Sequence, residues 1–253
     1  MSDESYDFGE LVVIQHETDV PLAALEPVLE GRAHDRPYRL ANLGAGDDLP
    51  GVSNRTRGVL VLGGSMGLPD DDRPDWIDDE LELLRASVKV GVPVFGICLG
   101  SQLLAEALGG EVQRRDVPEV GFFALHPTLG AEEDEVFAGW PAGAGVFMSH
   151  EDQVTRLPEG AVEMLHGSDG VPAWRAGDGR SYGVQFHPEL NTETLETWAA
   201  KDRLKRMMRQ AGRDEAALVE EFKRRERFLT AVGVSMVGRW LAGVVGADDP
   251  VER

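Results

Sequence analysis

The residues best suited to chemistry begin with a single cysteine set between glycines. The chain of 253 residues contains one cysteine, in Gly96-Ile97-Cys98-Leu99-Gly100. An apolar run precedes this pentapeptide and a helix-like stretch follows it, which is typical of a nucleophile elbow. The flanking glycines leave room for the sharp turn, and the start of a helix favours the thiolate. The pattern predicts that Cys98 is a nucleophile, although the pentapeptide alone also fits a buried core cysteine.

A histidine and a carboxylate that could assist this cysteine lie far downstream, in Gly183-Val-Gln-Phe-His-Pro-Glu-Leu190. In an extended chain, His187 and Glu189 project to the same side, and Pro188 disfavours a helix there. A carboxylate beside an imidazole fixes its tautomer and supports its charged form. His187 could therefore take the proton of Cys98 and return it to a leaving group, with Glu189 as the orienting acid.

The composition excludes several classes of partner. With 25 basic and 45 acidic residues the formal charge is -20, which disfavours nucleic acid binding and indicates a strongly solvated surface. One cysteine allows no internal disulfide, and the histidines lack zinc-ligand spacing with it, so no metal is expected. The N-terminus lacks the features of a secretory signal, and no apolar stretch is long enough to span a bilayer. We expect a soluble, cytoplasmic protein without membrane partners.

The elements that must position these residues alternate between strand and helix. Apolar, β-branched runs predict buried strands over 11–15, 58–62 and 92–97, and helical spacing of apolar residues predicts helices from Leu22 to a stop at Gly31 and over 76–90. Strands separated by helices pair in parallel. The sequence therefore predicts an α/β fold of three layers, with a mostly parallel central sheet and flanking helices.

The second half of the chain has a different pattern. Short β-like runs with frequent glycine and proline, from about 111 to 180, predict added antiparallel or edge strands, and 181–186 forms a final strand before His187. From Thr192 onward the chain is expected to be helical. The helical spacing of Phe228, Val232, Met236, Trp240 and Val244 favours a helix packed on the main domain, and a docking surface is the alternative. We expect a main domain over 1–190 and a helical C-terminal extension over 191–253.

Three motifs together resemble the class I glutamine amidotransferases, most closely the amidotransferase domain of guanosine monophosphate synthetase and its free-standing relatives. They are Gly96-Ile-Cys-Leu-Gly-Ser-Gln102, Gly183-Val-Gln-Phe-His-Pro-Glu189 and Met148-Ser-His-Glu-Asp152. The similarity spans roughly 11–190. It implies that Cys98 forms a covalent γ-glutamyl thioester with release of ammonia, and that water then hydrolyses the thioester.

The resemblance also implies roles for other residues. The two oxyanion donors are expected to be the amides of Leu99 and of Gly64, the latter in a glycine-rich turn after a strand. Gln102, one helical turn beyond the cysteine, is similar to a glutamine that contacts the amino-acid end of the substrate. The loop with Glu151 and Asp152 is expected to hold the α-amino and α-carboxylate groups. Glu151 departs from the family pattern, which usually has glycine there, and could pair with an α-ammonium group or point into solvent.

The leading hypothesis is a glutamine amidotransferase that hydrolyses glutamine and supplies ammonia to a separate acceptor or synthetase subunit. The chain has no phosphate-binding loop and no synthetase domain, and no cofactor is expected. A stand-alone γ-glutamyl peptidase or hydrolase would keep the same three residues and accept a larger leaving amine. A catalytically inactive regulatory or binding subunit is a further alternative, against which the presence of Cys98, His187 and Glu189 argues.

Overall fold

The fold of the chain is known from a computed structural model, which describes residues 9–33, 38–53, 55–70 and 73–245. Within these residues a nine-stranded sheet has the order β2-β1-β3-β4-β9-β8-β7-β5-β6. The strands are β1 (Glu10–Gln15), β2 (Tyr38–Asn42), β3 (Thr56–Val61), β4 (Val94–Ile97), β5 (Glu111–Pro127), β6 (Ala144–Arg156), β7 (Val162–His166), β8 (Ala173–Arg175) and β9 (Tyr182–Val184). The α-helices are α1 (Glu26–Ala33), α2 (Trp76–Lys89), α3 (Leu99–Ala107), α4 (Leu129–Glu132), α5 (Thr192–Ala199), α6 (Asp202–Gln210) and α7 (Glu215–Arg239).

The predicted parallel sheet is confirmed for the strands that lead to the candidate site. β2, β1, β3, β4 and β9 pair in parallel, in that spatial order. In the last pair, Ile97 of β4 lies opposite Val184 of β9. The carboxyl ends of parallel neighbours lie at one edge of a sheet. The segment that begins with Cys98 and the segment that leads to His187 therefore leave the sheet side by side.

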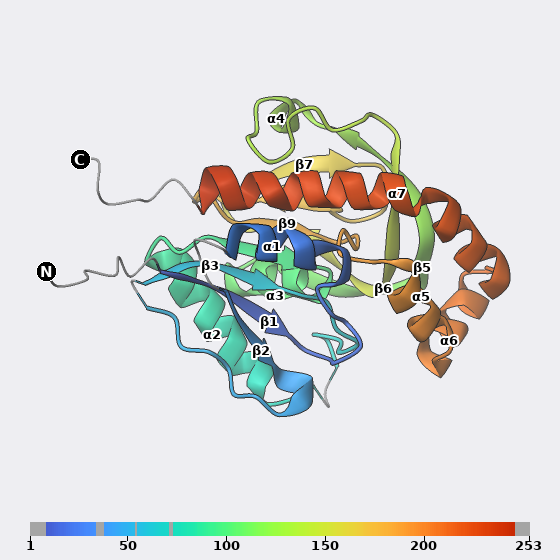
Figure 1. Cartoon of the computed structure of the whole chain (residues 1–253), viewed down its shortest axis with the longest axis horizontal. Coiled ribbons are helices and arrows are strands. Elements are labelled where there is room, and N and C mark those ends of the chain that lie inside the picture. Colours follow the sequence, from blue (N-terminus) through green and yellow to red (C-terminus); the bar gives the residue numbers. More distant parts are fainter. Residues whose placement is uncertain (1–8, 34–37, 54, 71–72, 246–253) are drawn as a thin grey trace, which may run out of the picture.

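Helices lie on both sides of the sheet and give the fold its three layers (Figure 1). On one side, Leu25 and Leu29 near the N-terminus and Trp240 after α7 pack against β-strand residues such as Phe95. On the other side, α2 and α3 pack against the alternate residues of β1, β3 and β4. A strand buried on both faces needs apolar residues at every position, which explains the continuous apolar runs.

The expected antiparallel strands are also confirmed. β8, β7, β5 and β6 extend the sheet beyond β9 with antiparallel pairings. β5 and β6 form a long pair, with register shifts between Glu111 and Val112 and between Arg114 and Glu119. None of the predicted runs corresponds to β2, which lies at the edge of the sheet. The β6 strand carries residues 149–152 along the side of the candidate site.

Two details of the helices differ from the sequence expectations. Helix α1 continues through Gly31 to Ala33. Within the predicted apolar face of α7, Met236 and Trp240 are buried, whereas Phe228 is 45% exposed. An α-helix turns about 400° in four residues, so residues spaced four apart move around the helix by about 40° per step. Phe228 and Trp240 are three steps apart and therefore differ in direction by about 120°. Leu229, the next residue, is buried in a separate cluster beneath the first half of α7.

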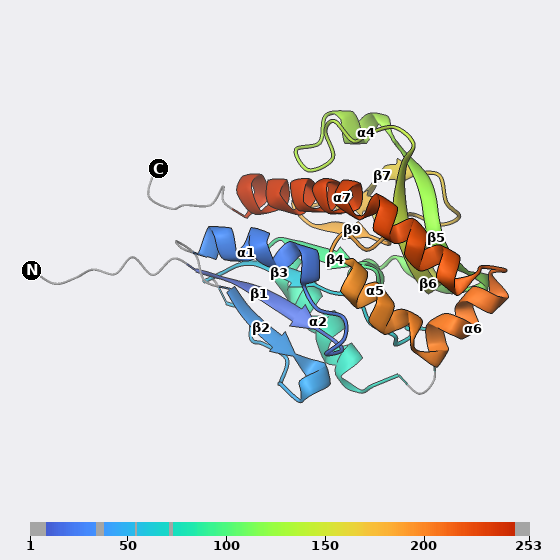
Figure 2. The same cartoon turned by 45° about the vertical axis from the view of Figure 1, so that its right-hand side comes forward.

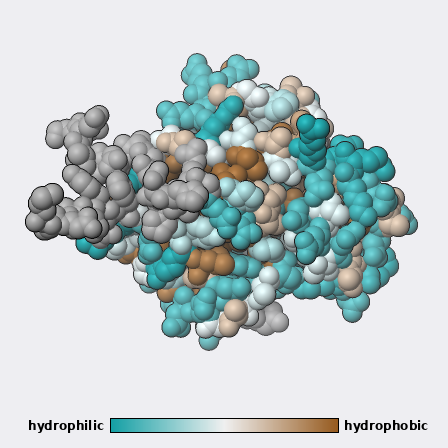
Figure 3. All heavy atoms as spheres, viewed as in Figure 1, coloured by the Kyte–Doolittle hydropathy of each residue, from teal (hydrophilic) through white to brown (hydrophobic). Residues whose placement is uncertain are grey.

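The C-terminal helices surround the carboxyl edge of the parallel strands. Figures 1 and 2 place α5 and α6 at one end of the molecule, with α7 running back from there across the sheet. Gly212, with φ +65°, provides the turn between α6 and α7. The face seen in Figure 3 is mostly hydrophilic, with apolar residues in small patches. Among the described residues, no helix has the length and apolar character needed to cross a membrane.

Candidate active site

The elbow predicted around Cys98 is present in the structure. Cys98 lies between β4 and α3 and has φ +52° and ψ -105°, a backbone conformation that residues other than glycine rarely adopt. A Cβ atom at Gly96 would lie 2.3 Å from the carbonyl oxygen of Gly100, and one at Gly100 would lie 2.4 Å from that of Val61. Both glycines are therefore required by the close approach of strand and helix. The elbow places the Cys98 side chain at the start of α3.

His187 and Glu189 form a buried pair next to this cysteine. The Nδ1 atom of His187 lies 2.7 Å from Oε1 of Glu189, and the backbone N–H of His187 donates to the carbonyl of Phe147 at 3.0 Å. The Nε2 atom of His187 has no hydrogen-bond partner among the described residues. Burial lowers the pKa of His187, but the negative charges of Glu189 and Cys98 outweigh it and raise this pKa to about 10. The imidazole is therefore held in its charged form.

A cavity of about 140 Å³ opens in front of Cys98 and His187. Its remaining walls come from the segment after β1, the turn after β3, strand β6 and the segment from α5 to α6, namely Glu17, Asp19, Val20, Gly64, Ser65, Ser149, Trp198, Lys201, Arg203, Leu204 and Met207. Charged side chains of both signs border the cavity. A small zwitterionic molecule would find complementary charges there.

Of the two predicted oxyanion donors, Gly64 lies in the wall of the cavity and Leu99 lies next to Gly64. Gly64 lines the cavity, and its N–H makes no hydrogen bond to any residue that the structure describes. A Cβ atom on Gly64 would lie 2.7 Å from Cδ2 of Leu99, so a larger residue there would displace the Leu99 side chain. Leu99 is the first residue of α3, where backbone N–H groups have no partner within the helix. The structure thus brings Gly64 and Leu99 together beside Cys98.

Gln102 lies behind the cavity instead of in its wall. Its Nε2 atom donates to the carbonyl of Asp152 at 2.8 Å and to Oε1 of Gln185 at 3.1 Å. Gln185 in turn donates to Sγ of Cys98 at 3.5 Å. The side chain of Gln102 therefore contacts the loop that was expected to hold the amino-acid end of the substrate, and no part of it lines the cavity.

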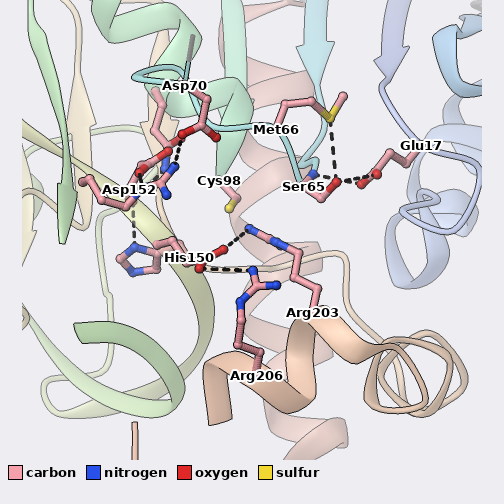
Figure 4. A network of polar contacts seen from close by, with 12 residues as sticks. Glu17, Ser65, Met66, Asp70, Cys98, His150, Asp152, Arg203 and Arg206 are labelled. Carbon is pink, nitrogen blue, oxygen red and sulfur yellow. Dashed lines mark hydrogen bonds and ion pairs between the residues drawn. The ribbon is translucent and has the colours of Figure 1, made fainter. Parts of the chain in front are cut away.

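The carboxylates of Glu151 and Asp152 are engaged by arginines (Figure 4). Glu151 contacts Nη2 of Arg203 at 3.0 Å and Nη2 of Arg206 at 3.4 Å, both from α6. Its side chain is 18% exposed, so in the unliganded protein it neither points freely into solvent nor waits unpaired for an ammonium group. Asp152 accepts a hydrogen bond from Arg114, which also binds Asp70 at 2.7 Å.

Two buried histidine–glutamate pairs support the loops of the site. His16 Nδ1 lies 2.9 Å from the carbonyl of Gly63, and its Nε2 lies 3.1 Å from Glu80. His150 Nδ1 lies 2.8 Å from the carbonyl of Asp152, and its Nε2 lies 2.9 Å from Glu119. One pair therefore holds the turn after β3. The other holds residues 150–152, which were expected to form a loop and instead belong to strand β6.

Sequence reasoning missed several residues of the site. His16 and Glu17 directly follow the buried run of β1. Polar residues at the carboxyl end of a parallel strand are a pattern that predicts a place in the site. Trp198, Lys201, Arg203 and Leu204 come from the C-terminal helices. No motif or spacing distinguishes them from ordinary helical residues, because their place over the cavity depends on how the helices fold back.

The sequence is similar to those of known proteins over more than half of the chain. The family model for glutamine amidotransferase class-I matches residues 48–207. The chain is 39% identical over 143 residues to the glutamine-hydrolysing GMP synthase of Leifsonia xyli subsp. xyli, a region that is 55% of this chain and 27% of the relative. The chain thus spans about a quarter of the length of this curated relative.

Two solved structures share the fold over nearly the whole chain. A glutamine amidotransferase from Thermotoga maritima has a TM-score of 0.78 at 24% identity, covering 92% of this chain and 98% of its own. One from Methylobacillus flagellatus has a TM-score of 0.79 at 24% identity, covering 94% and 96%. At this identity the two show the fold alone, whereas the family model matches more than half of the sequence. The chain belongs to the class I glutamine amidotransferase family.

Proposed function

We propose that this protein hydrolyses the side-chain amide of glutamine, or of a γ-glutamyl compound, through a thioester on Cys98. The observation that carries the proposal is the arrangement of Cys98 and His187 in one cavity wall, with Nδ1 of His187 held by Glu189 at 2.7 Å. A nucleophile, a base and an orienting acid in this order are the parts needed for covalent amide hydrolysis.

In the proposed mechanism, the Cys98 thiolate attacks the amide carbon and the carbonyl oxygen becomes an oxyanion. The N–H groups of Gly64 and Leu99 stabilise this oxyanion. The charged His187 gives a proton to the nitrogen as the carbon–nitrogen bond breaks, and ammonia leaves. Neutral His187 then takes a proton from water, which attacks the thioester and releases glutamate and the thiolate.

The amino-acid end of the substrate is proposed to lie toward residues 149–152 and α6. Glu151 with Arg203, and Asp19 with Lys201, already form ion pairs at this end of the cavity. An α-carboxylate can join the cations and an α-ammonium group can join the carboxylates without leaving a charge unpaired. Asp152 supports the loop through Arg114. Gln102 is proposed to act by holding that loop, through its hydrogen bond to the Asp152 carbonyl.

The leading form of the proposal is an ammonia donor that works with a separate acceptor or synthetase subunit. It is supported by the similarity to glutamine-hydrolysing GMP synthases, of which the matched region forms about a quarter. Donors of this kind gain by keeping the oxyanion hole unformed until the acceptor is ready, because hydrolysis without an acceptor wastes glutamine. The isolated protein should then hydrolyse glutamine slowly.

One observation favours a second candidate, a γ-glutamyl hydrolase that acts alone. The turn that carries Gly64 is anchored on both sides, by His16 at the Gly63 carbonyl and by Glu17 at Ser65. An oxyanion hole that is already formed needs no partner. Such an enzyme should cleave a γ-glutamyl conjugate rapidly on its own.

A substrate panel tests both candidates. The purified protein is assayed alone on glutamine, γ-glutamyl peptides and γ-glutamylamines, and again in its native cell extract, with Cys98→Ser as the matched control. Slow glutamine hydrolysis that the extract accelerates supports the donor, and fast cleavage of one conjugate with poor use of glutamine supports the stand-alone hydrolase. If the protein cleaves no substrate under either condition and a glutamine-like electrophile does not label Cys98, the proposed function is wrong.

A further inference from the structure

A charged pair lies directly behind the turn that carries Gly64. The side chains of His16 and Glu80 are both fully buried. The two carboxylate oxygens of Glu80 lie 3.1 and 3.2 Å from Nε2 of His16, and the Gly63 carbonyl lies 2.9 Å from Nδ1. The ring of Trp76 stacks on the His16 imidazole, with centroids 5.5 Å apart and planes 10° apart.

The partners of His16 define its hydrogen-bonding role. A backbone carbonyl can only accept a hydrogen bond, so Nδ1 of His16 donates to the Gly63 carbonyl. Burial lowers the pKa of His16, but the charge and hydrogen bond of Glu80 and the Gly63 carbonyl raise it above its ordinary value. The direction of this pKa shift favours the imidazolium, whose two ring nitrogens both donate and which has no acceptor to offer.

We propose that His16 and Glu80 are positioning residues that fix the Gly63–Gly64 peptide in the orientation that keeps the Gly64 N–H available to the substrate oxyanion. This inference rests on the proposed amide hydrolysis. The peptide unit is planar and trans, so a carbonyl directed at His16 places the N–H of Gly64 on the opposite side. The reversed orientation would set that N–H against a ring nitrogen that also donates, and both groups would lose their partner.

A turn made of two glycines needs such a lock. Gly63 and Gly64 have few backbone restraints of their own, so their shared peptide can rotate at low cost. The following peptide is held separately, because the N–H and hydroxyl of Ser65 donate to the carboxylate of Glu17 at 2.9 and 2.6 Å. His16 and Glu17 are neighbours at the end of β1, which pairs with β3. The first strand therefore fixes the turn that follows its neighbour.

Stability alone does not account for this pair. Replacing a buried ion pair by apolar side chains of similar volume is often neutral or stabilising, whereas removal of one partner leaves a buried charge uncompensated. The informative comparison therefore changes both residues together. His16→Phe combined with Glu80→Met removes the donor while keeping a ring against Trp76. His16→Asn combined with Glu80→Met returns a donor at the position of Nδ1.

The test compares reactions of Cys98 that do and do not form an oxyanion. The variant with His16→Phe and Glu80→Met should lose about 100-fold to 1,000-fold in kcat on the best wild-type substrate, which is the usual effect of removing one oxyanion donor. Its KM should change by less than about threefold. Alkylation of Cys98 by iodoacetamide forms no oxyanion and should keep its wild-type rate. The variant with His16→Asn and Glu80→Met should have a kcat at least about tenfold higher than the variant with His16→Phe and Glu80→Met. Thermal unfolding confirms that the variants are folded.

Clear outcomes would overturn the inference. The inference is wrong if the folded variant with His16→Phe and Glu80→Met has a kcat within about threefold of wild type. It is also wrong if kcat and the rate of Cys98 alkylation fall by the same factor in that variant. If the variants do not fold, nitrogen NMR of wild-type protein labelled in histidine decides, because an Nδ1 without a proton on His16 also overturns it. A wild-type protein that cleaves no substrate would instead refute the proposed function and leave the protonation of His16 to be read by NMR.

Discussion

The indole ring of Trp198 lies edge-on against the imidazole of His187, with ring centroids 5.1 Å apart and an interplanar angle of 73°. The indole N–H also donates to the carbonyl of Asp19 at 2.7 Å. Trp198 is the last large side chain of α5, so a helix beyond the predicted main domain contacts the proposed general base. The contact restricts the imidazole to one ring position.

This contact predicts graded effects at Trp198. Trp198→Phe keeps an aromatic edge near His187 but loses the bond to Asp19, and Trp198→Ala loses both. An aromatic pair contributes about 0.5–1.5 kcal/mol, so Trp198→Ala should lower kcat/KM by about 2- to 10-fold, and Trp198→Phe by less. Steady-state kinetics on the best substrate from the panel measures this. Equal activity of the alanine variant and wild type would show that the contact does not position the base.

The backbone of Cys98 predicts an unusual order of stability among inactive variants. Cys98→Ala and Cys98→Gly should both lose about 10⁴-fold or more in kcat, because the nucleophile is gone. Backbone strain of about 1–3 kcal/mol at φ +52° disappears with glycine, whereas the more flexible unfolded chain costs about 0.4–1 kcal/mol. The glycine variant should be more stable than the alanine variant by about 1 kcal/mol in urea unfolding. A more stable alanine variant would contradict the strain.

The orienting acid should matter less than the base. Glu189→Gln keeps His187 in place and should lower kcat by about 10⁴-fold or less, whereas His187→Ala should lower it by about 10⁶-fold, by analogy with serine–histidine–aspartate triads. KM should change little in both. Both variants are compared at equal folded fraction by circular dichroism. Equal losses would mean that Glu189 has a role other than orienting the imidazole.

The raised pKa of His187 predicts how stability depends on pH. Between pH 6.5 and about 10 the folded protein keeps a proton on His187 that the unfolded chain releases. The stabilisation is complete below pH 6.5 and is lost as the pH rises through about 10. The free energy of unfolding should fall over this window. Glu189→Gln removes the main charge that raises this pKa, so its urea midpoint should fall less over the same range, and an equally steep fall would contradict the assignment.

The sequence predicted the parallel half of the fold and the elbow well, because continuous apolar runs and the glycines around Cys98 reflect strong local constraints. Contacts between segments that lie far apart in the chain could not be predicted from the sequence. The pairing of Glu151 with Arg203 depends on the fold-back of α6 onto β6, which no local pattern encodes. The exposure of Phe228 depends on the drift of a long helix across two separate clusters.

The ion pair between Asp19 and Lys201 joins two segments of the cavity wall that lie far apart in the sequence, and it sets an order in time for the appearance of the site. Ribosomes add roughly 5–20 residues per second, so tens of seconds separate the synthesis of these two side chains. A nascent chain that has released Cys98, His187 and Glu189 still lacks Trp198, Lys201 and the rest of the roof. Trp198 and Lys201 therefore cannot cover Cys98 until the residues of α5 and α6 have been made and have folded back.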